Sequence, residues 1–407
     1  MADFHQSGCV ATLHRLDTKN RAAMERELEA FALHRPIALV LPCLFSEFSR
    51  PAIGAIVEHL ERARYVDTVV LVLGKASAAD LLQAKAALAR LPQRLTLIWN
   101  DGPRVQAFYD LLRQHDLDVG GDGKGRSCWL GYGHVLAEGR CQVIAAHDCD
   151  ITTYNGELLQ RLCYPLVHPT LGFEFAKGYY ARVNGTLNGR VTRLFVAPLL
   201  RALDAIVGRV PLLDYLGSFR YPLSGEFAMT TALARTNRIP CNWGLEVGVL
   251  AEVYRNCALP RICQTEVCGV YDHKHQALAI GDATTGLLKM AVEVGQTLLR
   301  ALAAEAVVLT DAMLNTLLAR YVRVAEDAID AYEADAAANS LAFDRHREEE
   351  SVDAFAAALR IASARHLDDP LAVRLMPSWK RVIAAIPGVL DQLAYAVECD
   401  SRAAVLA

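Results

Sequence analysis

Short apolar runs alternate with segments of helical periodicity along the first 155 residues of the chain. Four runs have the length and apolar content of buried strands, at residues 36–42, 68–73, 94–99 and 142–147. Segments with a helical period lie between them, at residues 52–64, 78–91 and 127–138. Strands that alternate with helices of this length are typical of right-handed βαβ units. The pattern therefore predicts an α/β domain with a mostly parallel sheet flanked by helices.

The rest of the chain is predicted to form two further parts, 156–285 and 286–407. The first of these is irregular, with short strands and helices predicted at 171–176, 191–207, 225–236, 245–254 and 265–271. In the second, alanine and leucine recur at helical spacing, which predicts an α-helical C-terminal extension. The charged run at 345–350 is interpreted as a solvated helix face. Residues 1–34 are predicted to form a helical N-terminal arm.

Composition and charge narrow the class of protein. The chain has 407 residues, of which 53% are hydrophobic and 22% charged, so it is globular. A net charge of −4 provides no basic field for nucleic acid. No apolar run reaches the roughly 18 residues of a membrane span, and the N-terminus lacks a signal core. The eleven cysteines form no CxxC pair, so we expect free thiols in a cytoplasmic protein without a zinc or disulfide framework.

The most informative chemistry follows the apolar run at 142–147, which ends in Asp148-Cys149-Asp150. In open α/β sheets, ligands bind beyond the carboxyl ends of the strands. Two carboxylates at such an end suit Mg²⁺ or Mn²⁺, which prefer oxygen ligands and keep positions open for substrate phosphates. A structural alternative is that Asp148 caps a turn and Asp150 caps a following helix.

Two other segments add weaker signals for the same chemistry. The loop at 120–126 is rich in glycine and carries Lys124 just before a predicted helix, a combination that suits phosphate, although the spacing is not that of a Walker loop. His273, in the segment at 271–275, is placed to add a nitrogen ligand to a metal held by carboxylates. The alternatives are a surface loop in the first segment and exposed histidines in the second.

Two further sets of polar residues open predicted helices. Gly189, Arg190 and Thr192 offer backbone N–H groups, a guanidinium and a hydroxyl, which together suit a phosphate or carboxylate. Glu226 directly follows Gly225, Glu246 lies two residues after Gly244, and both are candidates to bind substrate hydroxyls. Ordinary helix capping is the alternative interpretation of both sets.

Taken in order, these pieces resemble the glucosyl-3-phosphoglycerate synthases, a family of retaining GT-A glycosyltransferases, and more distantly the mannosylglycerate synthases. The resemblance covers about residues 36–280. It rests on Val40-Leu41-Pro42-Cys43-Leu44, Gly123-Lys124-Gly125, Asp148-Cys149-Asp150, Lys177-Gly178-Tyr179-Tyr180, Gly189-Arg190-Val191-Thr192, Leu223-Ser224-Gly225-Glu226, Gly244-Leu245-Glu246-Val247-Gly248 and His273. It implies a GT-A (Rossmann-like) fold in which 1–155 binds the nucleotide-sugar and 156–285 binds the acceptor.

The resemblance also implies roles for individual residues. Metal ligands are Asp150 and His273, with Asp148 beside them at the donor. The donor nucleotide-sugar is bound by Leu44, Lys124, Asp148, Leu223 and Gly225. The phosphate and carboxylate of a small anionic acceptor are bound by Gly189, Arg190, Thr192 and His275. Glu246 joins Asp148 and Asp150 as a catalytic group near the reacting sugar. A homodimer is expected from the same resemblance.

Three segments depart from the family pattern. Phe45-Ser46-Glu47 replaces Asn-Glu-Glu, Leu73-Gly74-Lys75-Ala76 replaces Asp-Ser-Gly-Ser, and His275 replaces an asparagine. These departures leave open a UDP, GDP or ADP donor, glucose or mannose, and 3-phosphoglycerate or glycerate. Two other functions stay open: a sugar-1-phosphate nucleotidyltransferase and a non-catalytic nucleotide-sugar-binding protein. The first normally has a glycine-rich loop after its first strand, where this chain has residues 41–45.

Overall fold

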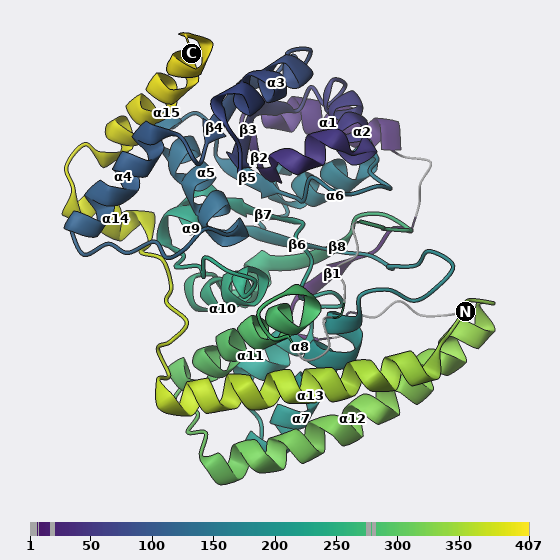
Figure 1. Ribbon diagram of the computed structural model, residues 1–407. Helices are drawn as coiled ribbons and strands as arrows, with labels where there is room; N and C mark the ends of the chain where they lie inside the picture. The colour runs from purple at the N-terminus through teal and green to yellow at the C-terminus, as the bar shows by residue number, and fades with distance from the viewer. Residues whose placement is uncertain (1–5, 7, 17–20, 274–277, 279–281, 407) are drawn as a thin grey trace.

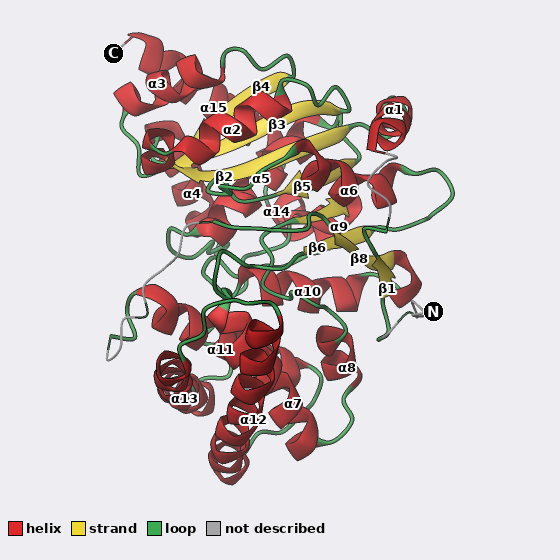
Figure 2. Cartoon of the chain, turned by 90° about the vertical axis from the view of Figure 1, so that its right-hand side faces the viewer, coloured by secondary structure: helices red, strands yellow, loops and turns green. Residues whose placement is uncertain are grey.

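One sheet organises the computed structural model, which describes residues 6, 8–16, 21–273, 278 and 282–406. In this part of the chain, eight strands pair in the order β1-β8-β6-β7-β5-β2-β3-β4 (Figure 2). All neighbours are parallel except β7, which is antiparallel to β5 and β6. The strands are β1 (Ala11–Leu13), β2 (Ile37–Leu44), β3 (Val66–Gly74), β4 (Arg94–Trp99), β5 (Val143–Ala146), β6 (Phe175–Tyr179), β7 (Phe227–Thr230) and β8 (Ile262–Glu266). The predicted α/β class is confirmed.

Alternating side chains of the strands enter two separate cores, one on each face of the sheet. In β2, Ala38 and Val40 face one core, whereas Ile37, Leu39 and Leu41 face the other. This two-sided burial explains why the strands are continuous apolar runs in the sequence.

Helices cover both faces. Those of the first two thirds of the chain are α1 (Arg21–Ala32), α2 (Pro51–Leu60), α3 (Ala78–Leu88), α4 (Pro103–Gln114), α5 (Lys124–Glu138), α6 (Gly156–Val167), α7 (Ala197–Val207), α8 (Pro211–Gly217), α9 (Thr231–Thr236) and α10 (Leu245–Asn256). Short helical turns are η1 (Phe45–Ser49), η2 (Val191–Val196) and η3 (Leu259–Arg261). The core that contains α1, α2 and α6 lies on one face, and the core that contains α4, α5, α7 and α10 lies on the other.

The C-terminal helices pack in two places. They are α11 (Gly286–Ala304), α12 (Asp311–Ala338), α13 (Arg345–Asp368), α14 (Trp379–Ala385) and α15 (Val389–Leu406). α11, α12 and α13 pack on one another and on α7, whereas α14 and α15 return to α9, α4 and α5 (Figure 1). Asp400 of α15 fixes this return, since its carboxylate accepts the backbone N–H groups of Arg104 and Val105 at the start of α4.

No single helix in the described ranges is long and apolar enough to cross a membrane. Trp379–Ala385 and Val389–Ala403 reach that length and composition only as a pair, and the two are bent by 101°.

Several predicted elements of the middle part are wrong in type or extent. Residues 225–236 contain strand β7 before the short helix α9, because a segment of only four residues does not distinguish a strand from a helix. The strands predicted at 171–176 and 265–271 are shifted to β6 and β8.

The N-terminal arm holds strand β1 as well as helix α1, since β1 pairs with the exposed edge of β8.

The helix predicted at 191–207 begins with the π-helical turn η2 before it continues as α7. Pro198 has no N–H group to donate to the carbonyl of Leu194, which instead accepts the hydroxyl of Tyr321 on α12 at 2.7 Å. The carbonyl group that Pro198 leaves without a helical partner thus binds the C-terminal extension.

Candidate active site

Asp148 and Asp150 lie at the edge of the sheet that is formed by the carboxyl ends of its parallel strands. Asp148 and Asp150 follow the last residue of β5, and Leu44 and Gly74 end the parallel strands β2 and β3 at the same edge. In a sheet of this kind that edge is where ligands bind. The sequence-based placement of the carboxylates beyond the strand is confirmed.

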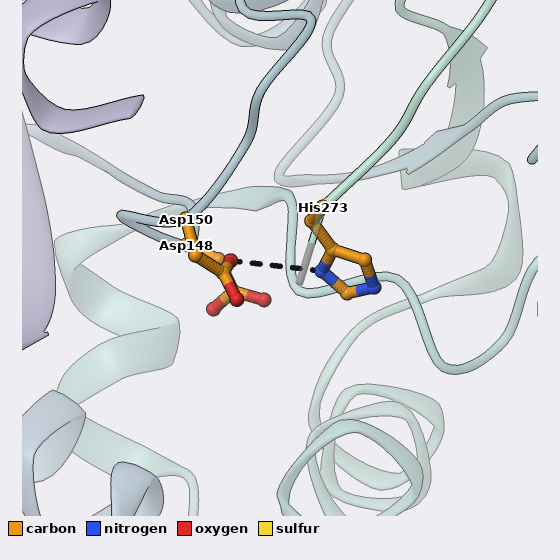
Figure 3. A group of neighbouring side chains, drawn as sticks. All are labelled: Asp148, Asp150 and His273. Atoms are coloured by element: carbon orange, nitrogen blue, oxygen red, sulfur yellow. Dashed lines mark ion pairs between the residues drawn. The ribbon is translucent and has the colours of Figure 1, made fainter. Parts of the chain in front are cut away.

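A short antiparallel pairing brings His273 to the same place, although about 120 residues separate it from the aspartates. Ile151 and His273 form a β-bridge, and the N–H of Thr152 donates to the carbonyl of Asp272 at 2.9 Å. One ligand atom from each of Asp148, Asp150 and His273 lies within 4.8 Å of the others (Figure 3).

These three side chains fit a divalent cation. His273 Nδ1 lies 3.6 Å from Asp150 Oδ1. Both atoms are shielded from solvent, and within the described ranges neither has a hydrogen-bond partner. Unpaired buried polar atoms are costly unless a ligand satisfies them, and two carboxylates with one imidazole are donors that suit Mg²⁺ or Mn²⁺.

Lys124, at the first position of α5, joins the metal cluster to Glu246. Its Nζ lies 2.5 Å from Asp148 Oδ1 and 2.9 Å from Glu246 Oε1. Burial lowers the pKa of Lys124, but the two carboxylates outweigh that effect and hold its pKa well above the usual value. Burial also opposes ionisation of Asp148, yet Lys124 keeps the pKa of that carboxyl below its usual value. Both groups are therefore charged.

The formal charges of this cluster leave a deficit that a divalent cation balances. Asp148, Asp150 and Glu246 contribute −3 and Lys124 contributes +1, so the sum is −2. Such a deficit in a partly buried site favours binding of a doubly charged cation.

Two glycines at the start of α5 lie close to another backbone segment. A Cβ atom on Gly123 or Gly125 would lie 2.4 or 2.0 Å from the carbonyl oxygen of Cys241 or Pro240, respectively. The N–H of Gly125 already donates to the carbonyl of Cys241 at 3.1 Å. These glycines therefore allow close packing of the loop on another backbone segment, and this packing directs Lys124 toward the carboxylates.

Glu226, which the sequence offered as a candidate to bind substrate hydroxyls, is a buried carboxylate that supports the metal-side residues. Glu226 has no exposed surface and accepts hydroxyl groups from Tyr180 and Tyr271, each at 2.7 Å, and from Ser224 at 2.9 Å. Tyr271 stacks on Tyr180 at 3.7 Å and meets the ring of His273 edge-on at 5.4 Å. Glu226 thus fixes the segment that carries His273, and it precedes strand β7 instead of capping a helix.

Lys177 lies next to Ser224. Its ammonium group is buried and donates to the carbonyl of Ser224 at 2.6 Å. Burial lowers the pKa of Lys177 to about 8, while the carboxylates of Glu246 and Glu226 oppose this shift. Lys177 therefore holds the backbone next to Gly225, a residue expected to contact the donor.

The predicted acceptor residues form a second cluster at the start of η2. Gly189 has φ +76°, and a Cβ atom there would lie 2.9 Å from Tyr221 Oη, so this position requires glycine. Thr192 is buried, and Arg190 is partly exposed. In the same loop, Asn184 donates to Asp272 at 3.0 Å, which places the loop beside the segment of His273. His275 lies outside the described residues.

Comparisons with known proteins identify the family. No family model matches the chain. The glucosyl-3-phosphoglycerate synthase of Persephonella marina is 45% identical over 98% of this chain and 99% of its own length. The chain belongs to the glucosyl-3-phosphoglycerate synthase family. The family's enzyme of Methanococcoides burtonii is 37% identical over 98% of both chains. This protein is therefore a glycosyltransferase, as the resemblance implied.

Solved structures of the Mycobacterium tuberculosis glucosyl-3-phosphoglycerate synthase share the fold. One, in complex with Mn²⁺, UDP-glucose and phosphoglyceric acid, has a TM-score of 0.52 and 23% identity over 74% of this chain and 89% of that chain. Another, in complex with Mg²⁺ and UDP, has a TM-score of 0.52, 23% identity and coverage of 74% and 88%. At this identity the likeness supports the GT-A fold.

The departures from the pattern of glucosyl-3-phosphoglycerate synthases are local. Leu44, the last residue of β2, is 41% exposed. Its apolar surface is therefore free to contact the flat ring of a nucleotide base. The following residues form the turn η1, in which Phe45 stacks on Phe48 and the carboxylate of buried Glu47 lies 3.4 Å from Arg50. Glu47 is thus directed into the protein.

The charged run at 345–350 also differs from its prediction. Glu348 is 4% exposed, and its carboxylate contacts both Arg190 and Arg193. The interpretation as a solvated face is wrong at this residue, because the helical spacing that exposes the neighbouring acids turns this one toward the acceptor loop.

The structure gives one prediction for the donor side of the site. A Cβ atom on Gly225 would lie 2.6 Å from Asp148 Oδ2 and 2.7 Å from Lys124 Nζ. We expect Gly225→Ala to separate these two groups and to lower kcat/KM by roughly 100-fold, which is the effect of a displacement of about 1 Å in an active site. Steady-state release of nucleoside diphosphate measures this change.

Gly54→Ala is the matched control, since Gly54 lies in α2 with nothing within 4 Å of its would-be Cβ. This control should keep full activity and gain up to about 1 kcal/mol of helix stability. Full activity of a folded Gly225→Ala enzyme would contradict the close contact.

Proposed function

We propose that this enzyme transfers glucose from UDP-glucose to the hydroxyl of 3-phospho-D-glycerate in a reaction that depends on Mg²⁺ or Mn²⁺. The observation that carries the proposal is the cluster of Asp148, Asp150 and His273 at the carboxyl edge of the sheet. The names of the relatives and the ligands in their structures support the choice of glucose, UDP and phosphoglycerate.

The reaction breaks the bond between the sugar C1 and the β-phosphate oxygen, and negative charge develops on the departing diphosphate. Asp150 and His273 are the ligands that would hold the cation, which supplies a Lewis acid and a template for the diphosphate. Lys124 keeps Asp148 and Glu246 fixed on either side of its ammonium group. Preorganised charges of this kind stabilise the transition state without further rearrangement.

Glu246 orients the sugar in this proposal. It lies in the first turn of α10, is buried, and has one carboxylate oxygen bound to Lys124. The other oxygen can accept a sugar hydroxyl. Glu246 is engaged by Lys124, so we assign it no role as a covalent nucleophile.

The acceptor is held by the loop at 189–192 in this proposal. Arg190 and the backbone of Gly189 bind its phosphate and carboxylate, and Thr192 adds a hydroxyl. The acceptor oxygen then forms a bond to C1 on the face from which the diphosphate departs, and its proton passes to the departing phosphate oxygen. Retention of the anomeric configuration follows from this same-face exchange. Proximity of the bound partners supplies on the order of several kcal/mol.

Nucleoside diphosphate release from UDP-, GDP- and ADP-linked glucose and mannose tests this function. Each donor is supplied with Mg²⁺, alone, with 3-phosphoglycerate or with D-glycerate. We expect rapid release only with UDP-glucose and 3-phosphoglycerate, and loss of that release after chelation. A preference for GDP-mannose or D-glycerate would replace the proposed substrates, and release without any acceptor would contradict the transfer reaction.

His275→Asn tests the acceptor choice, because His275 stands where the family has an asparagine. We expect this variant to change the ratio of kcat/KM for 3-phosphoglycerate and D-glycerate by about tenfold, the effect of one changed hydrogen bond to a charged group. Competition between the two acceptors in one reaction gives the ratio directly. An unchanged ratio would remove His275 from the acceptor site.

We also propose that the enzyme is a homodimer of the cytoplasm, on the strength of the family resemblance and the eleven cysteines, all of which are free thiols. Light scattering on the purified protein tests the dimer, and a mass of one chain would exclude it.

A further inference from the structure

A carboxylate from the C-terminal extension lies between Arg190 of the proposed acceptor loop and Arg193 of η2. Glu348, in the first turn of α13, has its Oε1 2.8 Å from Arg190 Nε and its Oε2 2.8 Å from Arg193 Nη2. Glu348 is 4% exposed, whereas the next residue, Glu349, is exposed and pairs with Arg345. Glu348 is thus the residue of the charged run at 345–350 that contacts the proposed acceptor loop.

Arg193 anchors the carboxylate. Its guanidinium is buried, donates to the carbonyls of Asn188 and Leu187 at 2.9 and 3.1 Å, and lies over the ring of Tyr332 at 4.7 Å. These contacts hold Arg193 in place, and its buried charge needs a partner in this position. Glu348 supplies that partner and is held in place by it.

Arg190 is less confined. Its side chain is 27% exposed, and the contact that the described residues give it uses Nε. Its two terminal amino groups are not engaged by that contact. A guanidinium is planar, so a bond to the Nε edge fixes the plane in which the two amino groups point.

The loop that carries Arg190 connects the extension to the metal side of the site. The N–H of Ala342, just before α13, donates to the carbonyl of Gly185 at 2.9 Å, and Ala342 pairs with Thr186. On its other side, Asn184 of the loop contacts Asp272, the neighbour of His273. The helical extension is therefore fastened to the loop at the position where the acceptor is expected.

We propose that Glu348 is a positioning residue for the acceptor: it holds the Nε edge of Arg190 so that both terminal amino groups face a small anion with phosphate and carboxylate groups. The proposal rests on the acceptor role of Arg190 in the proposed function. Two arginines and one glutamate leave a formal charge of +1 at the loop, which attracts the anion instead of repelling it.

A competing role is that Glu348 occupies Arg190 until the acceptor displaces it. The structure favours positioning, because departure of Glu348 would leave the buried guanidinium of Arg193 without its counter-charge, which is strongly unfavourable. The two roles give opposite changes in the KM for the acceptor when the carboxylate is removed.

Glu348→Gln tests the proposal by steady-state kinetics of the purified enzyme. An amide cannot accept from both arginines, so Arg190 loses its fixed orientation. We expect the KM for 3-phosphoglycerate to rise about tenfold, while the KM for UDP-glucose and kcat stay within about twofold of the wild type. The melting temperature should fall by several degrees, because buried Arg193 loses its counter-charge. Glu349→Gln, one residue further on the exposed face, is the matched control and should change none of these values.

A double-mutant cycle separates positioning from general damage. If Glu348 acts through Arg190, then Glu348→Gln should change the acceptor KM little further in the Arg190→Ala background. Glu348→Asp, which keeps the charge, should recover part of the loss and covers the case in which the glutamine variant does not fold.

Three outcomes overturn the proposal: an unchanged acceptor KM, a lowered KM, which would make Glu348 a competitor of the acceptor, or additive effects in the cycle. Turnover of the wild-type enzyme tests the proposed function separately. Absence of 3-phosphoglycerate-dependent turnover in the wild type contradicts that function, whereas normal wild-type turnover with unaffected Glu348 variants contradicts the positioning role alone. Calorimetric binding of 3-phosphoglycerate to each variant gives a readout independent of turnover.

Discussion

Asp150→Ala is expected to lower kcat by roughly 1,000-fold or more, the loss typical for removal of a main source of transition-state charge stabilisation. The variant removes one of the two oxygen ligands beside His273, so the remaining donors cannot hold a cation against the leaving diphosphate. Release of UDP at saturating substrates measures the change. The melting temperature should rise with Mn²⁺ in the wild type and stay constant in the variant, since a cation that binds the folded state stabilises it.

Asp204→Ala serves as the control, because Asp204 is an exposed acid on α7, away from the sheet edge. It should leave both the activity and the Mn²⁺ effect intact. Full turnover by Asp150→Ala, or an undiminished rise of its melting temperature with Mn²⁺, would remove Asp150 from the metal site.

Arg190→Ala is expected to raise the KM for 3-phosphoglycerate by roughly 100-fold, since loss of a charge-assisted contact to an anion costs on the order of 2–3 kcal/mol. The KM for UDP-glucose should stay within about twofold, because Arg190 belongs to the loop before η2 and not to the cluster of Lys124 and Asp148. Initial rates with each substrate varied in turn give the two constants.

Arg209→Ala is the control for charge alone, since Arg209 is a highly exposed cation paired with Asp214. Its kinetic constants should not change. Equal increases in both KM values for Arg190→Ala would point to a general disturbance of the enzyme, and unchanged values would place the acceptor elsewhere.

Much of the first 155 residues could be predicted from the sequence, because local signals decide that part of the fold. Strands buried on both faces are continuous apolar runs, as in residues 37–44. Three of the helices between them begin with a local start signal, which is a proline in α2 and α4 and a capping residue in α3. Ser77 and Asp80 form a complete capping box at the start of α3, for example. The position of Asp148 and Asp150 beyond a strand follows from the same signals.

Short elements of the middle part were not predictable in this way. Strand β7 has only four residues and is a strand because β5 and β6 offer their edges to it on both sides. The same run would suit a helix in another setting, since pairing across the sheet outweighs local preference. The three residues of β1 are a strand for the same reason, at the edge of β8.

By itself, the sequence determined the α/β class, the edge that carries the carboxylates and the family, because these depend on local periodicity and on short motifs in a fixed order. The pairing of His273 with Asp150 was expected from the family resemblance, but only the tertiary structure showed that Lys124 lies between two acids and Glu348 between two arginines. Such contacts depend on pairing and packing between segments far apart in the chain. Burial of these charges costs free energy unless every charged partner is in place.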